Sequence, residues 1–274
     1  ILDGGAFNGG YQYGMLFYLR ELEFLNLTHI DRISGCSIGA ILAVVYFAKK
    51  LDHSIKIYED ILKSFRKTCH FNELSKVITD FVNEHVDNVK NMDNKLFITY
   101  HDMLTMKQVV VSKYKSKEDL IQTLIKSTHI PFLIDGSPLY KNRYSDGYTP
   151  YIFPKSIKRI LFISLINYNS LKTTLYIKNE VNIWTRLLTG IVDINNFFMN
   201  SNSNTCSYID TWGSCQFCQI YFREIFIIFM GLIFRGFKCL ESMLPNDIYN
   251  NVYIIRLNEI GSMLYKDLLT YYIL

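Results

Sequence analysis

The 274-residue sequence lacks several patterns that mark common functional classes. Its net charge is only +4, and no stripe of basic residues interleaved with aromatics favours nucleic acid as a partner. The glycine-rich stretch near its start contains neither G-x-G-x-x-G nor G-K-[ST], which argues against a dinucleotide or Walker loop. No internal repeat is visible. We therefore expect no nucleic-acid partner and no bound nucleotide cofactor.

Metal-binding and secretion signals are also scarce. Among the six cysteines only Cys215 and Cys218 form a C-x-x-C pair, and a zinc site would need a second close pair. We expect unpaired, reduced thiols, no metal and no cofactor. The chain opens on apolar residues without Met or the basic start of a signal peptide, so we expect further residues before Ile1 and an intracellular, cytoplasmic location.

What the sequence does contain is a large apolar fraction, 49% against 20% charged residues, which is enough for a sizeable core. Strand-like and helix-like segments alternate, which predicts an α/β protein with a largely parallel central sheet. Helices are predicted over 13–25, 38–48, 54–67, 71–86, 116–127 and 260–273. Strands are predicted over 30–34, 109–111, 143–145, 160–166 and 252–257, and a loop over 195–205.

A G-x-S-x-G sequence lies between a predicted strand and a predicted helix. Gly35 and Gly39 flank Ser37 and would let two backbone segments approach a sharp turn. In that setting Ser37 stands at the start of a helix, where amide groups and the helix dipole favour a developing anion. A tight turn that merely contains a serine is the alternative explanation.

Two further stretches could complete a catalytic site. Gly4, Gly5 and Ala6 lie between an apolar start and a helix, so their amides could form an oxyanion hole. Asp146 ends a short predicted strand and precedes Gly147, which suggests a positioned carboxylate or, alternatively, an Asp-Gly turn.

Taken in this order, the stretches resemble the patatin-like phospholipase family. The family's glycine-rich loop, G-x-S-x-G, S-x-x-x-P-x-x-F/L and D-G-G/A match residues 4–14, 35–39, 127–133 and 146–147, and the resemblance covers about 1–166. It implies a three-layer α/β/α sandwich in one domain over 1–274. It places the catalytic core in 1–166, and in 167–274 it implies an extension of helices and strands with a helical, apolar C-terminal region. It also implies a Ser37–Asp146 dyad that hydrolyses lipid esters at a membrane surface to which the protein binds peripherally.

The resemblance is not complete. Ala6 stands where the family usually has a third glycine, and Asn8 stands where it usually has Arg or Lys. Tyr148 follows Asp146-Gly147 in place of Gly or Ala. Two alternatives therefore stay open: a catalytically degenerate protein that binds lipids or membranes on this scaffold, and an esterase or acyltransferase in which His129 pairs with Ser37.

The C-terminal part contains one very apolar segment, residues 217–240. Charged residues interrupt it and leave an uninterrupted stretch of 10 residues at 225–234. A bilayer span needs about 20 residues, so we expect a packed helix, with an interfacial helix and a membrane span as alternatives.

Overall fold

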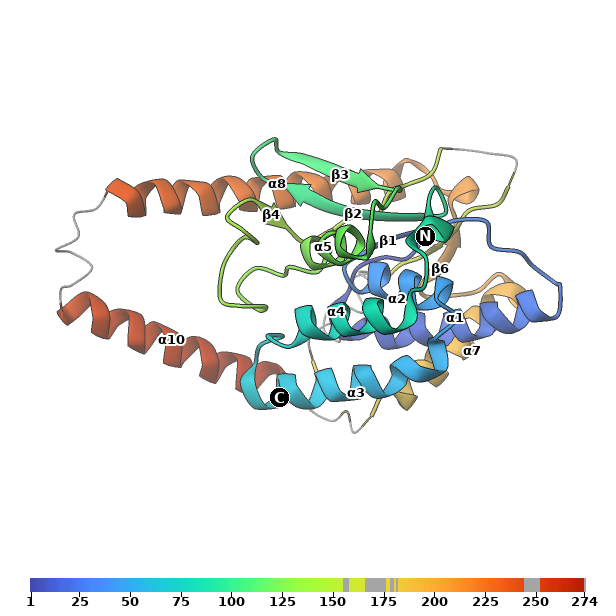
Figure 1. The fold of residues 1–274 in the computed structure, drawn as a ribbon, viewed down its shortest axis with the longest axis horizontal. Coiled ribbons are helices and arrows are strands. Elements are labelled where there is room, and N and C mark those ends of the chain that lie inside the picture. Colours follow the sequence, from blue (N-terminus) through green and yellow to red (C-terminus); the bar gives the residue numbers. More distant parts are fainter. Residues whose placement is uncertain (155–157, 166–175, 178–179, 181, 244–251, 274) are drawn as a thin grey trace.

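The computed structural model describes residues 1–154, 158–165, 176–177, 180, 182–243 and 252–273 (Figure 1). Its central sheet is flanked by helices, so the predicted α/β class is confirmed. Five predicted helices are present, with ends within a few residues of the prediction. They are α1 (Gly9–Phe24), α2 (Ile38–Phe47), α3 (Leu51–Thr68), α4 (Leu74–His85) and α5 (Lys117–Ser127).

These helices form where apolar side chains recur at helical spacing and cap residues mark the ends. α3 buries Leu62 and Phe65 on the face that its apolar spacing predicts. At the start of α5, the Ser116 hydroxyl accepts a hydrogen bond of 3.2 Å from the amide of Asp119, as the capping pattern predicts. α2 is apolar almost all round and lies in the middle of the core.

The sheet is parallel at its centre and antiparallel at its margins. β1 (Ile33–Cys36) runs parallel to β2 (Leu96–Asp102), while β3 (Lys107–Val111) and β4 (Tyr144–Ser145) run antiparallel to β2. A second pair, β5 (Leu161–Ile163) and β6 (Cys206–Tyr208), is antiparallel.

The first residues of the chain connect the two groups of strands. Leu2 forms parallel bridges to Gly35 on one side and to Ile163 on the other. The chain then turns sharply through the short 3-10 helix η1 (Ala6–Asn8) into α1. The glycine-rich loop is thereby placed at the carboxyl end of a central strand-like segment, beside the end of β1, which is where open α/β sheets commonly bind ligands.

Several predictions in the second half of the chain are wrong. Residues 195–200 belong to helix α7 (Trp184–Asn200) and not to a loop, and the expected strand at 252–257 is the start of helix α10 (Val252–Ile273). A short apolar run fits either element, and here it continues into a helical pattern without a break. β2 and β6 were not predicted. The predicted strand over 160–166 forms only as Leu161–Ile163, and residue 166 lies outside the described residues.

The apolar segment forms one long helix, α8 (Ser214–Met243), which contacts Met103, just after β2, and Tyr148. Within Ser214–Gly236, the most apolar 18-residue window has a mean hydropathy of 1.8, and by length and composition alone this helix could cross a membrane. The uninterrupted apolar stretch is still only 10 residues, but Arg223 and Glu224 turn toward the protein, so the apolar outer face extends beyond that stretch.

Candidate active site

The turn between β1 and α2 has the strained geometry of a nucleophile elbow. Ser37 has φ 52° and ψ −127°, which is unusual for a residue with a side chain. A Cβ atom on Gly35 would lie 2.5 Å from the carbonyl oxygen of Gly39, and one on Gly39 would lie 2.7 Å from that of Leu2. Both glycines are therefore required by close backbone approach, and Ser37 is held at the start of α2.

Ser127 ties this elbow to the loop that carries Asp146. Its hydroxyl accepts a hydrogen bond of 3.0 Å from the Ser37 amide, and its carbonyl accepts one of 3.0 Å from the Gly147 amide. A Cβ on Gly147 would lie 2.1 Å from the carbonyl oxygen of Thr99 in β2, so this position also requires glycine. The two stretches, distant in sequence, are thus joined through one residue, by its side chain on one side and by its backbone on the other.

Asp146 is a buried carboxyl group with an unusual acidity. Burial raises its pKa to about 7, and a hydrogen bond with the Ser37 side chain, one with the Gly147 amide and the positive charge of Arg223 limit this rise. Among the described residues, its Oδ1 has no hydrogen-bond partner. A carboxylate with a pKa near neutrality can accept a proton during a reaction and release it again.

Two histidines lie near this loop. His129 is buried, and its Nε2 lies 3.3 Å from the hydroxyl of Ser137; in the described part of the chain no contact joins its ring to Ser37. His101 places Nδ1 3.1 Å from the backbone oxygen of Asp146, and burial lowers its pKa. The geometry therefore does not favour the His129 alternative.

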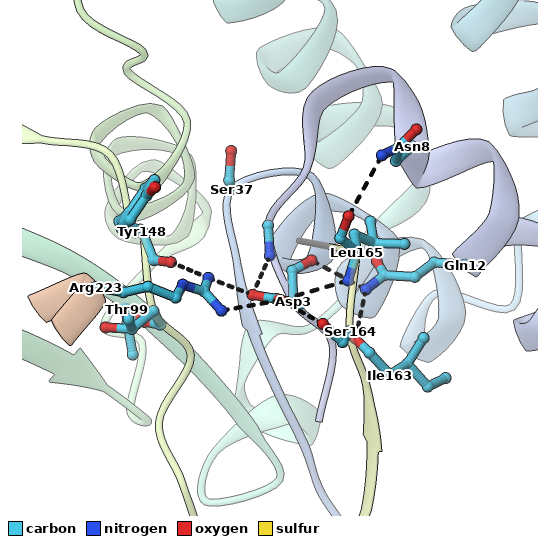
Figure 2. Close-up of polar contacts among 12 residues, drawn as sticks. Asp3, Asn8, Gln12, Ser37, Thr99, Tyr148, Ile163, Ser164, Leu165 and Arg223 are labelled. Carbon is cyan, nitrogen blue, oxygen red and sulfur yellow. Dashed lines mark hydrogen bonds and ion pairs between the residues drawn. The ribbon is translucent and has the colours of Figure 1, made fainter. Parts of the chain in front are cut away.

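The glycine-rich loop is held by Asp3, whose importance the sequence did not reveal. Its carboxylate accepts hydrogen bonds of 2.9 Å from the Gly4 amide and of 3.4 Å from the Leu165 amide. Arg223 of α8 donates to both carboxylate oxygens, at 2.7 and 3.1 Å. Figure 2 shows Asp3 at the centre of this network, with Arg223 on one side and Leu165 on the other, while the Ser37 hydroxyl points away from it.

This arrangement divides the three candidate oxyanion donors. The amide of Gly4 is engaged by Asp3, whereas no acceptor meets the amides of Gly5 and Ala6 among the described residues. Ala6 has φ 42°, a left-handed conformation that a residue with a side chain adopts at a cost. Of the three candidate amides, those of Gly5 and Ala6 are therefore the two without an acceptor among the described residues.

The two other departures from the family pattern both contact the C-terminal helices. Arg186 of α7 donates a hydrogen bond of 2.6 Å to the side-chain oxygen of Asn8 and pairs with Glu180 at 2.8 Å. The backbone oxygen of Tyr148 accepts a hydrogen bond from Arg223, whose guanidinium also lies 5.3 Å from the Tyr148 ring centre. A positive charge therefore does lie beside Asn8, supplied by another helix.

A cavity of about 930 Å³, including its open mouth, reaches Ser37. Its wall contains Ser37 and Ala6, and most of the remainder is aliphatic or aromatic side chains of α2, α3, α4 and α5. None of the described residues that line it carries a charge. Such an apolar lining suits the hydrocarbon part of a lipid whose polar end lies at Ser37.

Together these features define an α/β protein with a serine on a strand-to-helix elbow beside an apolar cavity. The family model for patatin-like phospholipases matches residues 1–152. The chain therefore belongs to the patatin-like phospholipase family, as the resemblance indicated.

Three curated relatives match the same part of the chain. Omega-hydroxyceramide transacylase of Mus musculus is 28% identical over 157 residues, which is 53% of this chain and 26% of the relative. The 1-acylglycerol-3-phosphate O-acyltransferase Pnpla3 of Mus musculus is 30% identical over 155 residues, 53% of this chain and 37% of the relative. The Homo sapiens omega-hydroxyceramide transacylase is 28% identical over 158 residues, which is 53% of this chain and 29% of the relative. The match thus spans between about a quarter and somewhat more than a third of these relatives' own length.

Proposed function

We propose that this protein is a lipid acyl hydrolase that uses Ser37 as nucleophile and Asp146 as general base. The observation that supports this most is the apolar cavity, because its wall brings Ser37 and Ala6 together with a surface suited to an acyl chain. Membership of the patatin-like family supports lipid as the substrate class.

In the first half of the proposed reaction, Ser37 Oγ attacks the ester carbonyl and its proton passes to the Asp146 carboxylate. The amides of Gly5 and Ala6 donate to the resulting oxyanion, and each such donor contributes about 3 kcal/mol in comparable enzymes. Collapse of the intermediate breaks the ester C–O bond. The proton on Asp146 moves to the departing alcohol, and the acyl group stays on Ser37.

In the second half, Asp146 accepts a proton from an incoming hydroxyl group, which attacks the acyl-serine. The bond between the acyl carbon and Ser37 Oγ then breaks, and the proton on Asp146 returns to Ser37 Oγ. Water as the acceptor gives a fatty acid, whereas a lipid hydroxyl gives a transacylated lipid. The relatives named as a transacylase and an acyltransferase favour the second outcome as an alternative. The proposed chemistry on Ser37 is the same in both cases.

A first experiment tests the nucleophile, using a fluorescent fluorophosphonate on the wild type, Ser37→Ala and Asp146→Asn. We expect labelling of the wild type, none of Ser37→Ala and slow labelling of Asp146→Asn. A folded wild type that does not label would contradict the enzyme assignment and leave the degenerate lipid-binding protein as the account.

A second experiment identifies the acceptor. A mixed lipid panel is incubated in ¹⁸O-water, and the products are analysed by mass spectrometry. Labelled fatty acid indicates hydrolysis, while unlabelled acyl groups on new lipids indicate transfer.

A further inference from the structure

The charged and apolar residues of α8 are sorted onto different faces of the helix. Arg223 pairs with Asp3, and its side chain is only 13% exposed. Glu224 is half-buried; burial raises its pKa, and a hydrogen bond with Thr149 and the charge of Arg223 limit the rise. Both ionisable side chains in the middle of this apolar helix are therefore turned toward the protein.

Further along, α8 continues to lie against the domain. Ile227 packs with Met103 in a small core cluster, and a Cβ on Gly231 would lie 2.2 Å from the Met103 sulfur. The rings of Phe234 and Phe132 meet edge to face at 5.5 Å. Between Arg223 and Phe234 the helix therefore lies against the domain.

The outer face of α8 is a continuous stripe of apolar side chains at helical spacing. Within Ser214–Gly236, only 11% of the most apolar 18-residue window is buried. The exposed large side chains of this stripe are Phe217, Tyr221, Phe222, Ile225, Phe226, Phe229 and Leu232. Large exposed apolar stripes rich in Phe and Tyr are uncommon on proteins that contact only water.

We propose that this outer stripe of α8 docks in the interface of a lipid bilayer, with the helix axis parallel to the membrane plane. A bilayer is favoured as the occupant because the segment has the length and hydropathy of membrane helices while both central charges are satisfied on the protein side. This inference rests on the proposed function. A protein that acts on lipids must reach a membrane, and the stripe would contact it there. Through Arg223 and Asp3, the docked helix is connected directly to the glycine-rich loop.

The test measures binding without turnover, in a Ser37→Ala background. Flotation with phosphatidylcholine vesicles compares this protein with a version that also carries Phe222→Asp and Phe229→Asp, whose side chains are 68% and 58% exposed. The control pair is Leu188→Asp and Val192→Asp on α7, at 57% and 58% exposed. Circular dichroism melts verify that all versions fold.

We expect the α8 pair to reduce the vesicle-bound to free ratio by about tenfold or more, because aromatic burial is lost and charge is added to the stripe. The α7 pair should bind like the background, and binding should persist in about 0.5 M NaCl, where surface charge attraction is screened. Equal flotation of the α8 pair would overturn the proposal. Light scattering gives a second test. If the protein is a dimer that only the α8 pair of substitutions converts to a monomer, the proposal is also overturned, because a second copy of the chain then covers the stripe. If the hydrolase assignment is wrong, the Ser37→Ala protein should still float with the vesicles, so the two proposals can fail separately.

Discussion

Residues 1–152 and the helices after residue 182 contribute to the site in different ways. The first region supplies the groups that would react: Ser37, Asp146 and the glycine-rich loop. The second supplies charges that hold the loops in place, because Arg223 pairs with Asp3 and Arg186 contacts Asn8. The proposed catalytic groups and the residues that hold them in place thus come from separate parts of the chain.

The difference explains two of the departures from the family pattern. Asn8 and Tyr148 are unusual for the family, and each contacts an arginine from a helix outside the matched segment. A loop residue that relies on a neighbouring helix for charge need not carry that charge itself. The following predictions test this division, starting with the largest expected effect.

Asp146→Asn should affect activity and stability in opposite directions. Loss of the general base should lower kcat/KM by about 10²- to 10⁴-fold. Because burial raises the pKa of Asp146 to about 7, keeping it ionised at pH 8 costs stability, at about 1.4 kcal/mol per pKa unit. Chemical denaturation at pH 8 should therefore show a more stable variant. An equally stable or less stable variant would contradict the assigned acidity.

The same carboxyl group sets the expected pH dependence. Activity should fall below a midpoint near pH 7, as Asp146 becomes protonated. Stability should depend on pH in the opposite direction. Between about pH 4 and 7 the unfolded chain releases the Asp146 proton while the folded protein keeps it. The contribution of Asp146 to the free energy of unfolding therefore declines as the pH rises. A kcat/KM profile that is flat from pH 5 to 8 would argue against Asp146 as the base.

Arg223→Met should destabilise the protein by about 3–5 kcal/mol, because it leaves the Asp3 carboxylate buried and unpaired. The control is Arg20→Met, which removes an exposed pair with Asp52 in the first region and should cost no more than about 1 kcal/mol. Urea unfolding measures both. Adding Asp3→Asn to Arg223→Met should restore part of the loss, and equal costs for the two arginine variants would remove the distinction between the regions.

Val77→Phe should change the acyl-chain preference. Val77 lines the cavity, so a larger side chain should shorten the space and reduce kcat/KM for long-chain esters by about tenfold. Esters of short acids should be hydrolysed as before. A uniform reduction across chain lengths would indicate that the cavity does not hold the acyl chain.

Ala6→Gly should have the smallest effect. Glycine tolerates the φ of 42° found here, so the variant should gain at most about 1 kcal/mol of stability, less the entropy that glycine adds to the unfolded chain. A Gly5→Ala control should destabilise, since its Cβ would lie 2.6 Å from the Cβ of Leu165. Thermal melts distinguish the two.

The sequence predicted the first region better than the second for physical reasons. The elbow and the helices before residue 128 show local signals, namely glycines at a turn, apolar periodicity and the Ser116 cap. β6 has only three residues and shows no such signal. β2 does contain β-branched and aromatic residues typical of a strand, a local signal from which it could have been predicted. The pairing of Asp3 with Arg223 spans 220 residues, and its only trace was an arginine inside an otherwise apolar helix. A charge in such a segment could have indicated a buried partner.

The most direct test of the Ser37–Asp146 account is the rate at which a fluorophosphonate modifies the wild type across pH, with the adduct located by peptide mass spectrometry. The account predicts a single adduct on Ser37 whose rate rises with a midpoint near pH 7 and loses that dependence in Asp146→Asn. An adduct on another residue, or a Ser37 rate that Asp146→Asn leaves unchanged, would contradict it.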